Sequence, residues 1–250
     1  YVNLLVRVIA IIVVLVIVNK WTNPANKLSW TFLILLSPIF GLMVYFLFGR
    51  SGLTKHTRER MDAVNRQVEA LFQRDSAVEK GLEKESRSAY LQSSYIDKWA
   101  GFPLYQNTQT KYYSCGEEMF PDMLEALRGA KHFIFLEYFI IEEGYMFNTI
   151  LDILEEKAKA GVDVRFIYDD VGSINSISFG YYKKLQERGI PCVTFNPFKP
   201  LISVVMNNRD HRKIFVVDGY IGFTGGINLA DEYINKVKRF GYWKDTGVRI

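Results

Sequence analysis

The chain has 250 residues and a net charge of +4, which is enough length for one sizeable domain and too mild a charge to indicate, by itself, a nucleic-acid-binding protein. That charge fits a protein that works beside anionic lipid. The two cysteines, Cys115 and Cys192, are far apart and lack metal-ligand spacing, so we expect buried or ordinary thiols in a reducing cytosol.

Two apolar stretches open the chain. Residues 2–18 are apolar apart from Asn3 and Arg7, and residues 30–48 are apolar and carry no charge. Each is close to the roughly 20 residues that cross a bilayer, so we expect a transmembrane helical hairpin in residues 1–50. A signal peptide is the alternative for the first stretch, but its apolar run is long and no small-residue cleavage site follows it.

The charges that flank these stretches predict an orientation. Lys20 and Lys27 lie between the two spans, whereas a denser basic group follows the second span, against a single acid: Arg50, Lys55, Arg58, Arg60 and Glu59. The more positive side of a membrane protein is as a rule cytoplasmic. We therefore expect a multi-pass protein of the cell membrane whose remaining residues lie in the cytoplasm.

Residues 54–99 are charged and nearly without Gly and Pro, and Met61, Val64, Val68 and Leu71 recur at helical spacing. We expect a helical connector over residues 51–100. An amphipathic helix that lies on the membrane and a helix packed on its own domain both fit the pattern. Acids are as frequent as bases beyond Arg60, which favours the packed helix slightly.

From residue 102 onward, strand and helix patterns alternate. Strands are expected at 132–141, 162–168 and 191–195, and helices at 119–130, 147–160 and 179–188. This alternation predicts an α/β fold over residues 101–250, with a mixed, largely parallel sheet that helices cover on both faces. The apolar segment 199–209 is either core or a lipid-facing loop.

The next stretch has the spacing of a reactive site. His211 and Lys213 are two residues apart, so they share one face of a strand that begins there. Residues 214–217 are rich in β-branched and aromatic side chains and predict a buried strand. Asp218-Gly219 is typical of a two-residue hairpin turn, and residues 220–224 then form the returning strand.

A glycine pair and an amide follow the hairpin. Gly225 and Gly226 let the backbone approach a ligand closely, and Asn228 adds hydrogen-bond donors. An imidazole, an ammonium and an amide together suit attack on a phosphodiester: a nucleophile near neutral pH, a fixed positive charge, and donors for phosphate oxygens.

These residues resemble a known signature. The run His211-Arg212-Lys213-Ile214-Phe215-Val216-Val217-Asp218, with Gly225-Gly226-Ile227-Asn228 after it, is similar to the motif of the phospholipase D superfamily. The apolar spans and three further blocks resemble bacterial cardiolipin synthases over nearly the whole chain: Glu137-Tyr138, residues 168–173 and Trp243-Lys244-Asp245-Thr246. The superfamily needs two copies of the motif and this chain holds one, so we expect a fragment.

The resemblance implies a membrane-bound phosphatidyltransferase that makes cardiolipin from two phosphatidylglycerol molecules and releases glycerol, with no cofactor and no metal. One motif histidine forms a phospho-histidine intermediate and the other protonates the leaving alcohol. The resemblance suggests His211 as the nucleophile, although the sequence leaves that assignment open. Three alternatives remain: a phospholipase D-type hydrolase, a nuclease, and a non-catalytic membrane partner protein.

The implied partners are phosphatidylglycerol, an anionic phospholipid membrane and the second motif-bearing half of the same polypeptide, with a homodimer as an open alternative and no nucleic acid. Lys213 is expected to bind phosphate oxygens, and Asn228 to donate to the same oxygens. Asp218 belongs to the motif, but the Asp-Gly turn already gives it a structural purpose. Asp245 is implied to support the histidine of the other half.

Four other acidic residues have open roles. Glu137 interrupts a buried strand, which is costly unless the carboxylate is paired, so it either orients a catalytic group, binds a headgroup hydroxyl, or forms a structural ion pair. Asp210 stands where relatives often carry Asn or Leu, and a carboxylate there is expected to raise the pKa of His211. Asp169-Asp170 is expected to cap or turn the end of a strand.

Overall fold

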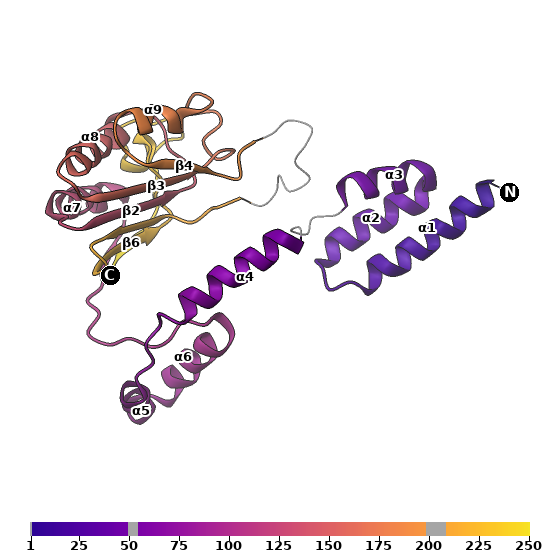
Figure 1. Ribbon diagram of the computed structural model, residues 1–250, viewed down its shortest axis with the longest axis horizontal. Helices are drawn as coiled ribbons and strands as arrows, with labels where there is room; N and C mark the ends of the chain where they lie inside the picture. Colours follow the sequence, from indigo (N-terminus) through magenta and orange to yellow (C-terminus); the bar gives the residue numbers. More distant parts are fainter. Residues whose placement is uncertain (1, 50–54, 199–208) are drawn as a thin grey trace. The chain divides into compact units, whose positions relative to one another are not determined.

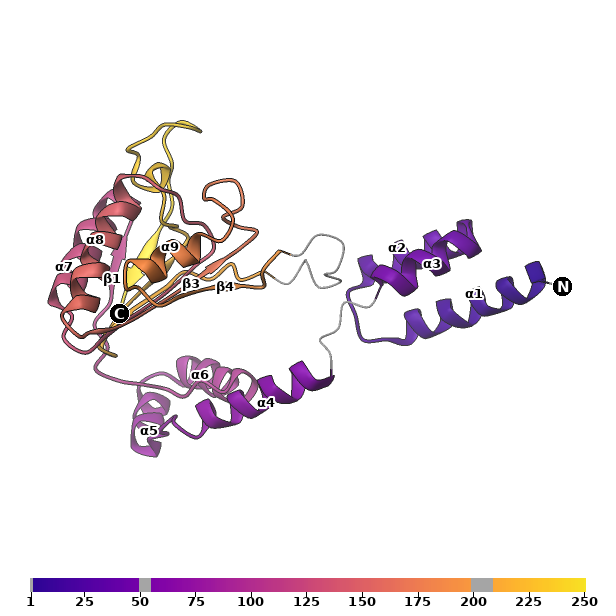
Figure 2. The same cartoon turned by 45° about the horizontal axis from the view of Figure 1, so that its top comes forward.

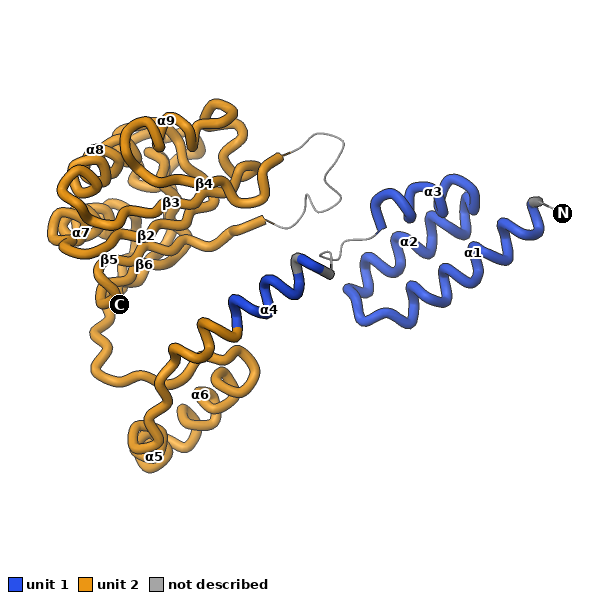
Figure 3. The backbone as a smooth tube through the Cα atoms, in the orientation of Figure 1, with its two compact units in different colours: residues 1–65, 200–205 blue, residues 66–199, 206–250 orange. Residues whose placement is uncertain are grey.

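The computed structural model describes residues 2–49, 55–198 and 209–250. The chain divides into two compact units between Asn65 and Arg66 (Figure 3). The expected segment 199–209, whether core or lipid-facing, lies outside the described residues apart from its last residue. The expected division into residues 1–50, 51–100 and 101–250 stays a prediction.

The first unit includes residues 55–65 of the next helix and three complete helices: α1 (Val2–Asn19), α2 (Pro24–Leu36) and α3 (Pro38–Phe48). They pack around a small apolar core made of Ala10, Ile17, Ile34, Leu42 and Tyr45. At Gly41 an added Cβ would lie 2.6 Å from the Cα of Ile34, so only glycine lets α2 and α3 approach this closely.

The predicted transmembrane hairpin is wrong. Among the described residues, no helix combines the length and the apolar character that a bilayer crossing requires. The second apolar stretch is two helices of 13 and 11 residues, because Ser37 leaves the helical conformation ahead of Pro38. The first is one helix of 18 residues. The multi-pass assignment and its orientation therefore lose their basis.

Among the described residues of 51–100, where a helical connector was expected, the structure has three helices, α4 (Lys55–Glu69), α5 (Ser76–Glu85) and α6 (Arg87–Ala100). Side-chain caps start the last two: Asp75 accepts the amide of Ala77 at 2.8 Å, and Ser86 accepts that of Ala89 at 3.3 Å. α5 and α6 pack on each other.

The rest of the second unit is an α/β layer pair (Figure 1). Its strands are short, and their bounds are β1 (Lys111–Tyr113), β2 (Phe133–Tyr138), β3 (Asp163–Asp169), β4 (Cys192–Phe195), β5 (Ile214–Val217), β6 (Ile221–Gly225) and β7 (Gly247–Arg249). The helices are α7 (Gly116–Gly129), α8 (Tyr145–Lys159) and α9 (Tyr181–Glu187), with a 3₁₀ turn η1 (Asp231–Ile234).

The seven strands form one sheet in the order β1-β7-β6-β5-β2-β3-β4. β2, β3 and β4 are parallel neighbours, whereas the other neighbouring pairs are antiparallel. The mixed sheet is as expected, but "largely parallel" is wrong. The motif hairpin β5–β6 joins the edge of β2, and β7 and β1 extend it, so antiparallel pairs outnumber parallel ones among the described strands.

All three helices pack on one face of this sheet (Figure 2), whereas helices on both faces were expected. The right-handed crossovers through α8 and α9 run in the same direction across the sheet, which places both helices on the same side. Their face holds the core, so Leu136, Phe166 and Phe215 are buried. On the opposite face Phe133 and Phe135 stack at 4.6 Å and are only half-buried.

Because the helices cover only one face of the sheet, we expect Phe→Ala to lower the free energy of unfolding more on that face than on the opposite one. Phe166→Ala removes a ring that is 1% exposed and should lower the free energy of unfolding by about 3–5 kcal/mol. Phe135→Ala, on the half-buried face, should cost about half as much. Urea unfolding of both variants measures the difference, and equal costs would contradict the layering.

Candidate active site

One edge of the sheet gathers most of the residues that the sequence singled out. β2 and β3 end at this edge, β5 begins there, and β6 ends there, as the pairs Glu137↔Ile214 and Ile214↔Thr224 show. His211 and Lys213 lie just before β5, while Asn228 and Asp245 follow β6 and precede β7. The sheet register therefore brings segments from four parts of the chain together.

His211 is exposed at this edge, and its ring centroid lies 4.6 Å from that of Phe139. Lys213, in contrast, is 4% exposed. Its Nζ donates to the backbone oxygen of His211 at 2.6 Å and lies 5.4 Å from the centre of the Phe139 ring. An accessible imidazole thus sits beside a buried ammonium.

Burial lowers the pKa of Lys213, and the negative charges of Asp245 and Asp210 oppose that effect. A buried ammonium is poorly screened by water, so its field acts strongly on an anion at the same edge. The same ammonium has three N–H donors, of which the bond to His211 uses one. The arrangement can hold a phosphate group against the imidazole.

Asn228 is 2% exposed and joins two parts of the site. Its Oδ1 accepts the amide of Ile140 at 3.0 Å, and its Nδ2 donates to the hydroxyl of Tyr233 at 2.7 Å. These bonds tie the segment after β2 to η1. The role expected for Asn228, donation to phosphate oxygens, stays a prediction, because the bonds seen here hold the protein's own chain.

Gly225 and Gly226 make room for the chain segment ahead of β7. A Cβ at Gly225 would lie 2.3 Å from the backbone oxygen of Thr246, and one at Gly226 would lie 1.9 Å from Oδ1 of Asp245. The amide of Gly226 also donates to the oxygen of Thr246 at 3.0 Å. The close approach expected at these glycines is therefore made by the protein itself, and it sets the Asp245 carboxylate beside the site.

Asp218 is not brought together with His211. It lies at the opposite end of β5, in the β5–β6 turn, with a left-handed φ of 53°. Its carboxylate accepts three consecutive amides, those of Lys131, His132 and Phe133, at 2.8, 2.7 and 2.9 Å. Burial acts to raise the pKa of Asp218, but these donors outweigh it and lower the pKa. The carboxylate fastens the turn to the start of β2.

Glu137 and Asp210 form a carboxyl pair with Arg212. The side chain of Arg212 leaves the chain between His211 and Lys213, toward the other face of the sheet. It donates to Oδ1 of Asp210 at 2.9 Å through Nε, and its Nη2 lies 2.8 Å from Oε1 of Glu137. That second distance suits an ion pair, but its geometry is not that of a hydrogen bond, so this oxygen lacks a hydrogen-bond donor among the described residues.

Burial, and after it the neighbouring Asp210, raises the pKa of Glu137 to about 7 against the opposing effect of Arg212. Burial acts the same way on Asp210, but bonds from Arg212 and Glu137 lower the pKa of Asp210 to about 2. Of the roles open for Glu137, the structure shows the ion pair. The Asp210 carboxylate is directed at Arg212, and its expected effect on His211 stays a prediction.

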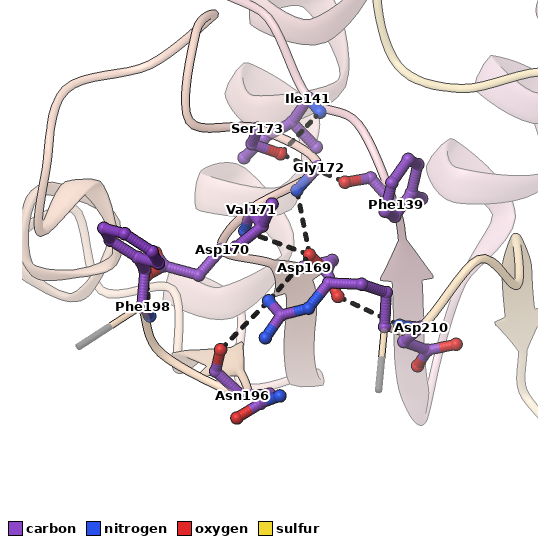
Figure 4. A network of polar contacts seen from close by, with 11 residues as sticks. Phe139, Ile141, Asp169, Asp170, Val171, Gly172, Ser173, Asn196, Phe198 and Asp210 are labelled. Atoms are coloured by element: carbon purple, nitrogen blue, oxygen red, sulfur yellow. Dashed lines mark hydrogen bonds and ion pairs between the residues drawn. The ribbon is translucent and has the colours of Figure 1, made fainter. Parts of the chain in front are cut away.

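Asp169 was expected to cap the end of a strand, and it does more than that (Figure 4). Its Oδ1 accepts the amides of Val171 and Gly172 at 3.0 and 2.8 Å, which closes the turn after β3. Its Oδ2 accepts the amide of Asp210 at 2.9 Å. The side chain is fully buried, and Arg209 Nη1 lies 3.3 Å from Oδ1. Asp169 therefore holds the residue directly before His211.

Two further residues of the site were missed. Ser173 donates through Oγ to the backbone oxygen of Phe139 at 3.2 Å and accepts the amide of Ile141 at 3.1 Å (Figure 4). Phe139 supplies the ring against His211. The sequence block 168–173 drew attention to this turn, but no pattern in it indicates which distant residues the turn contacts.

Comparisons with known proteins show which families the chain resembles. Residues 123–238 match the family described as "Cardiolipin synthase, PLD-like domain", and residues 8–50 match one described as "Phospholipase_D-nuclease N-terminal". A "Cardiolipin synthase" of Alkalihalophilus pseudofirmus is 35% identical over 230 residues, which are 91% of this chain and 46% of that protein. An "Uncharacterized protein" of Streptococcus mutans is 39% identical, covering 95% and 51%.

The chain belongs to the phospholipase D superfamily. Within it, the matching family is the one described as the PLD-like domain of cardiolipin synthases. The resemblance drawn from the motif is confirmed. The chain spans about half the length of the curated relatives it matches. A solved phosphatidylserine synthase of Haemophilus influenzae shares 19% identity at a TM-score of 0.44, over 57% of this chain and 33% of that one, and a likeness this low carries no argument.

The position of Asp218 predicts a structural effect. Asp218→Ala leaves three amides without their acceptor and places alanine at a left-handed φ, so the free energy of unfolding should fall by about 2–3 kcal/mol. Asp218→Asn, which tolerates that φ, should cost less. Urea unfolding measures both, with Asp152→Ala as the control, since Asp152 is 74% exposed. An unchanged Asp218→Ala variant would contradict the role in the turn.

The raised pKa of Glu137 predicts a pH dependence. A carboxyl group whose folded pKa lies above its ordinary value of 4.5 contributes stability below that value, and the contribution is lost as the pH rises through about 7. Glu137→Gln removes this loss. Relative to the parent chain, the variant should gain about 1–2 kcal/mol between pH 5 and pH 8, after allowance for partial solvent screening.

Unfolding in urea at both pH values gives that difference directly. Glu187→Gln, at an exposed position on α9, is the matched control and should show no comparable change between the two pH values. A Glu137→Gln variant that differs from its parent equally at pH 5 and pH 8 would show that the carboxyl pair does not titrate in this range.

Proposed function

We propose that the complete protein carrying this chain transfers a phosphatidyl group from one phosphatidylglycerol molecule to a second, yielding cardiolipin and glycerol. The observation that carries the proposal is the pairing of an exposed imidazole, His211, with a buried ammonium, Lys213. The choice of lipid substrate rests on the names of the relatives, because several that match nearly the whole chain are called cardiolipin synthase.

His211 acts as the nucleophile in the first half of the reaction. A ring nitrogen attacks phosphorus, an N–P bond forms, and the P–O bond to the glycerol headgroup breaks. The headgroup oxygen takes up a proton and leaves as glycerol. The phosphatidyl group remains on the histidine, so the free energy of the phosphodiester is retained and no nucleotide or other cofactor is required.

A second phosphatidylglycerol completes the transfer. The oxygen of its headgroup hydroxyl attacks phosphorus, the N–P bond breaks, and the hydroxyl proton passes to a base. The number of phosphodiester bonds is unchanged over the cycle. We assign the proton transfers to a histidine in the second half of the same polypeptide, as the resemblance implies, or to a second copy in a homodimer.

Lys213 stabilises the charge that develops on the phosphate oxygens. Its burial supports this role, because an ammonium held in a water-poor position need not shed solvent as the transition state forms. Gly225, Gly226 and Asn228 frame the same edge, and Asp245 lies close enough to Lys213 to act on its charge. We keep Asp245 as the carboxylate that supports the second histidine, and we assign Asp218 to the fold alone.

The test uses the complete gene product in a bacterial strain that contains phosphatidylglycerol but makes no cardiolipin. Expression should restore cardiolipin in the extracted lipids. His211→Ala should abolish it, and Lys213→Ala should lower turnover by about 10²–10³-fold, the usual cost of one charge-stabilising group. His132→Ala is the matched control, since its exposed side chain lies at the opposite edge of the sheet.

Three outcomes would count against the proposal. Phosphatidic acid in place of cardiolipin would indicate a phospholipase D-type hydrolase, with water as the acceptor. Cleavage of an oligonucleotide without any lipid product would indicate a nuclease. Unchanged lipids from a folded protein, with His211→Ala indistinguishable from the parent, would indicate a non-catalytic partner protein.

A further inference from the structure

The segment between η1 and β7 is a loop whose composition differs from its surroundings. Residues 236–244, here called the basic loop, contain four cationic side chains and no acidic one, with apolar and aromatic residues between them: Lys236, Val237, Lys238, Arg239, Phe240, Gly241, Tyr242, Trp243 and Lys244. In Figure 2 it is part of the yellow segment that extends beyond α8.

The basic loop exposes its apolar side chains. Phe240 is 69% exposed, Tyr242 63% and Val237 49%. Phe240 sits at the tip, where Arg239 and Gly241 pair across it and Gly241 has a left-handed φ of 85°. Water-exposed aromatic groups at a loop tip are unfavourable in solution, and they favour contact with a less polar surface.

The base of the loop is fixed. Asn235 donates through Nδ2 to the backbone oxygen of Trp243 at 2.8 Å, and Trp243 returns its amide to Oδ1 of Asn235 at 2.6 Å. The Trp243 ring packs on Tyr233 at 5.0 Å and on Phe240 at 5.8 Å. The tip is therefore held in place before any partner binds, which lowers the entropy cost of binding.

Two of the four cations of the loop contact a described partner. Arg239 lies 3.6 Å from Glu142, and Lys236 lies 4.0 Å from the centre of the Tyr145 ring. A pocket of about 350 Å³ adjoins the loop, and its lining combines four acids with two of the cations: Glu142, Glu143, Asp231, Glu232, Lys238 and Arg239. The described residues offer no ion-pair partner to Lys238 or Lys244, both of which are exposed.

We propose that the basic loop binds an anionic phospholipid bilayer, with Phe240 and Tyr242 in the headgroup layer and the lysines facing lipid phosphates. Aromatic side chains with flanking cations are the residues that settle at this interface. The loop begins and ends beside the site: Tyr233 bonds Asn228, and Asp245 follows Lys244. A bilayer held by the loop would therefore present headgroups at the edge that carries His211.

This inference deepens the proposed function, yet its test requires no turnover. An environment-sensitive dye is placed on the 250-residue chain through Phe240→Cys in a Cys115→Ser background, where the remaining Cys192 is buried. Vesicles of phosphatidylcholine and phosphatidylglycerol should shift the dye emission to the blue. The same dye at Tyr220→Cys, 70% exposed in the β5–β6 turn at the opposite edge, should not respond. A response at Phe240 with none at Tyr220 distinguishes contact through the loop from a general approach of the chain to the vesicle.

The charge contribution has its own comparison. Lys238→Gln with Lys244→Gln should raise the phosphatidylglycerol concentration at half-maximal signal roughly 25-fold, since each lysine near an anionic surface contributes roughly fivefold. Lys183→Gln with Lys184→Gln, on the exposed side of α9, should leave it unchanged. A second label at Tyr242→Cys should respond like that at Phe240, and far-UV circular dichroism checks the fold of each variant.

Several results would overturn the proposal. One is an unchanged emission at both loop positions, and another is an equal response to vesicles of phosphatidylcholine alone. A shift caused by a single-stranded oligonucleotide rather than by vesicles would assign the loop to nucleic acid. The dye measurement is repeated on the His211→Ala chain. A loop signal in that variant, combined with no cardiolipin formation by the complete parent protein, would support lipid binding by the loop and contradict the proposed reaction.

Discussion

The position of His211 depends on one buried carboxylate, that of Asp169. It accepts amides from its own turn and from Asp210, so a single side chain joins the end of β3 to the start of the motif strand. A buried carboxylate is stable only when hydrogen-bond donors satisfy its oxygens, and the loss of one of these bonds weakens the remaining ones. Ser173 extends the connection to Phe139, whose ring contacts the imidazole. The nucleophile and its aromatic neighbour are thus positioned by one turn.

The electrostatics of the site follow from the same edge. Because side chains alternate along an extended chain, His211 and Lys213 point to one face of the sheet and Arg212 points to the other. Two sets of charged groups are therefore separated by the sheet. On one side a buried ammonium meets an exposed imidazole; on the other, two carboxyl groups share an arginine. The glycine pair adds a spatial constraint, because the Asp245 segment occupies the space that side chains at Gly225 and Gly226 would need.

Much of this was predictable, and the limits have physical causes. Local patterns placed β2 to β6, α7 to α9 and the Asp218-Gly219 turn, since each depends on the chain's own periodicity. The sheet order was not predictable in the same way: β5 lies between β2 and β6, and nothing within a strand specifies its distant neighbour. β1 has three residues and too little pattern to find.

The error in the first unit has a different origin. The second apolar stretch was judged by hydropathy, which does not register that Pro38 excludes helix at the residue before it. For the site, His211 and Lys213 carried a recognisable spacing, whereas Asp169 and Phe139 are defined only by contacts across the sheet. The distant bond from Asp169 to Asp210 could not be read from either residue.

The strand order also has a consequence for biosynthesis. β2, β3 and β4, with α8 and α9 between them, are complete once Phe195 has emerged from the ribosome, but the outer edge of β2 stays unpaired until β5 is made. During that interval the nascent chain exposes an apolar strand edge that another chain can add to. Synthesis of the motif hairpin therefore pairs the exposed edge of β2 and also adds the reactive histidine. A chain released before that point is both prone to aggregation and without the reactive group.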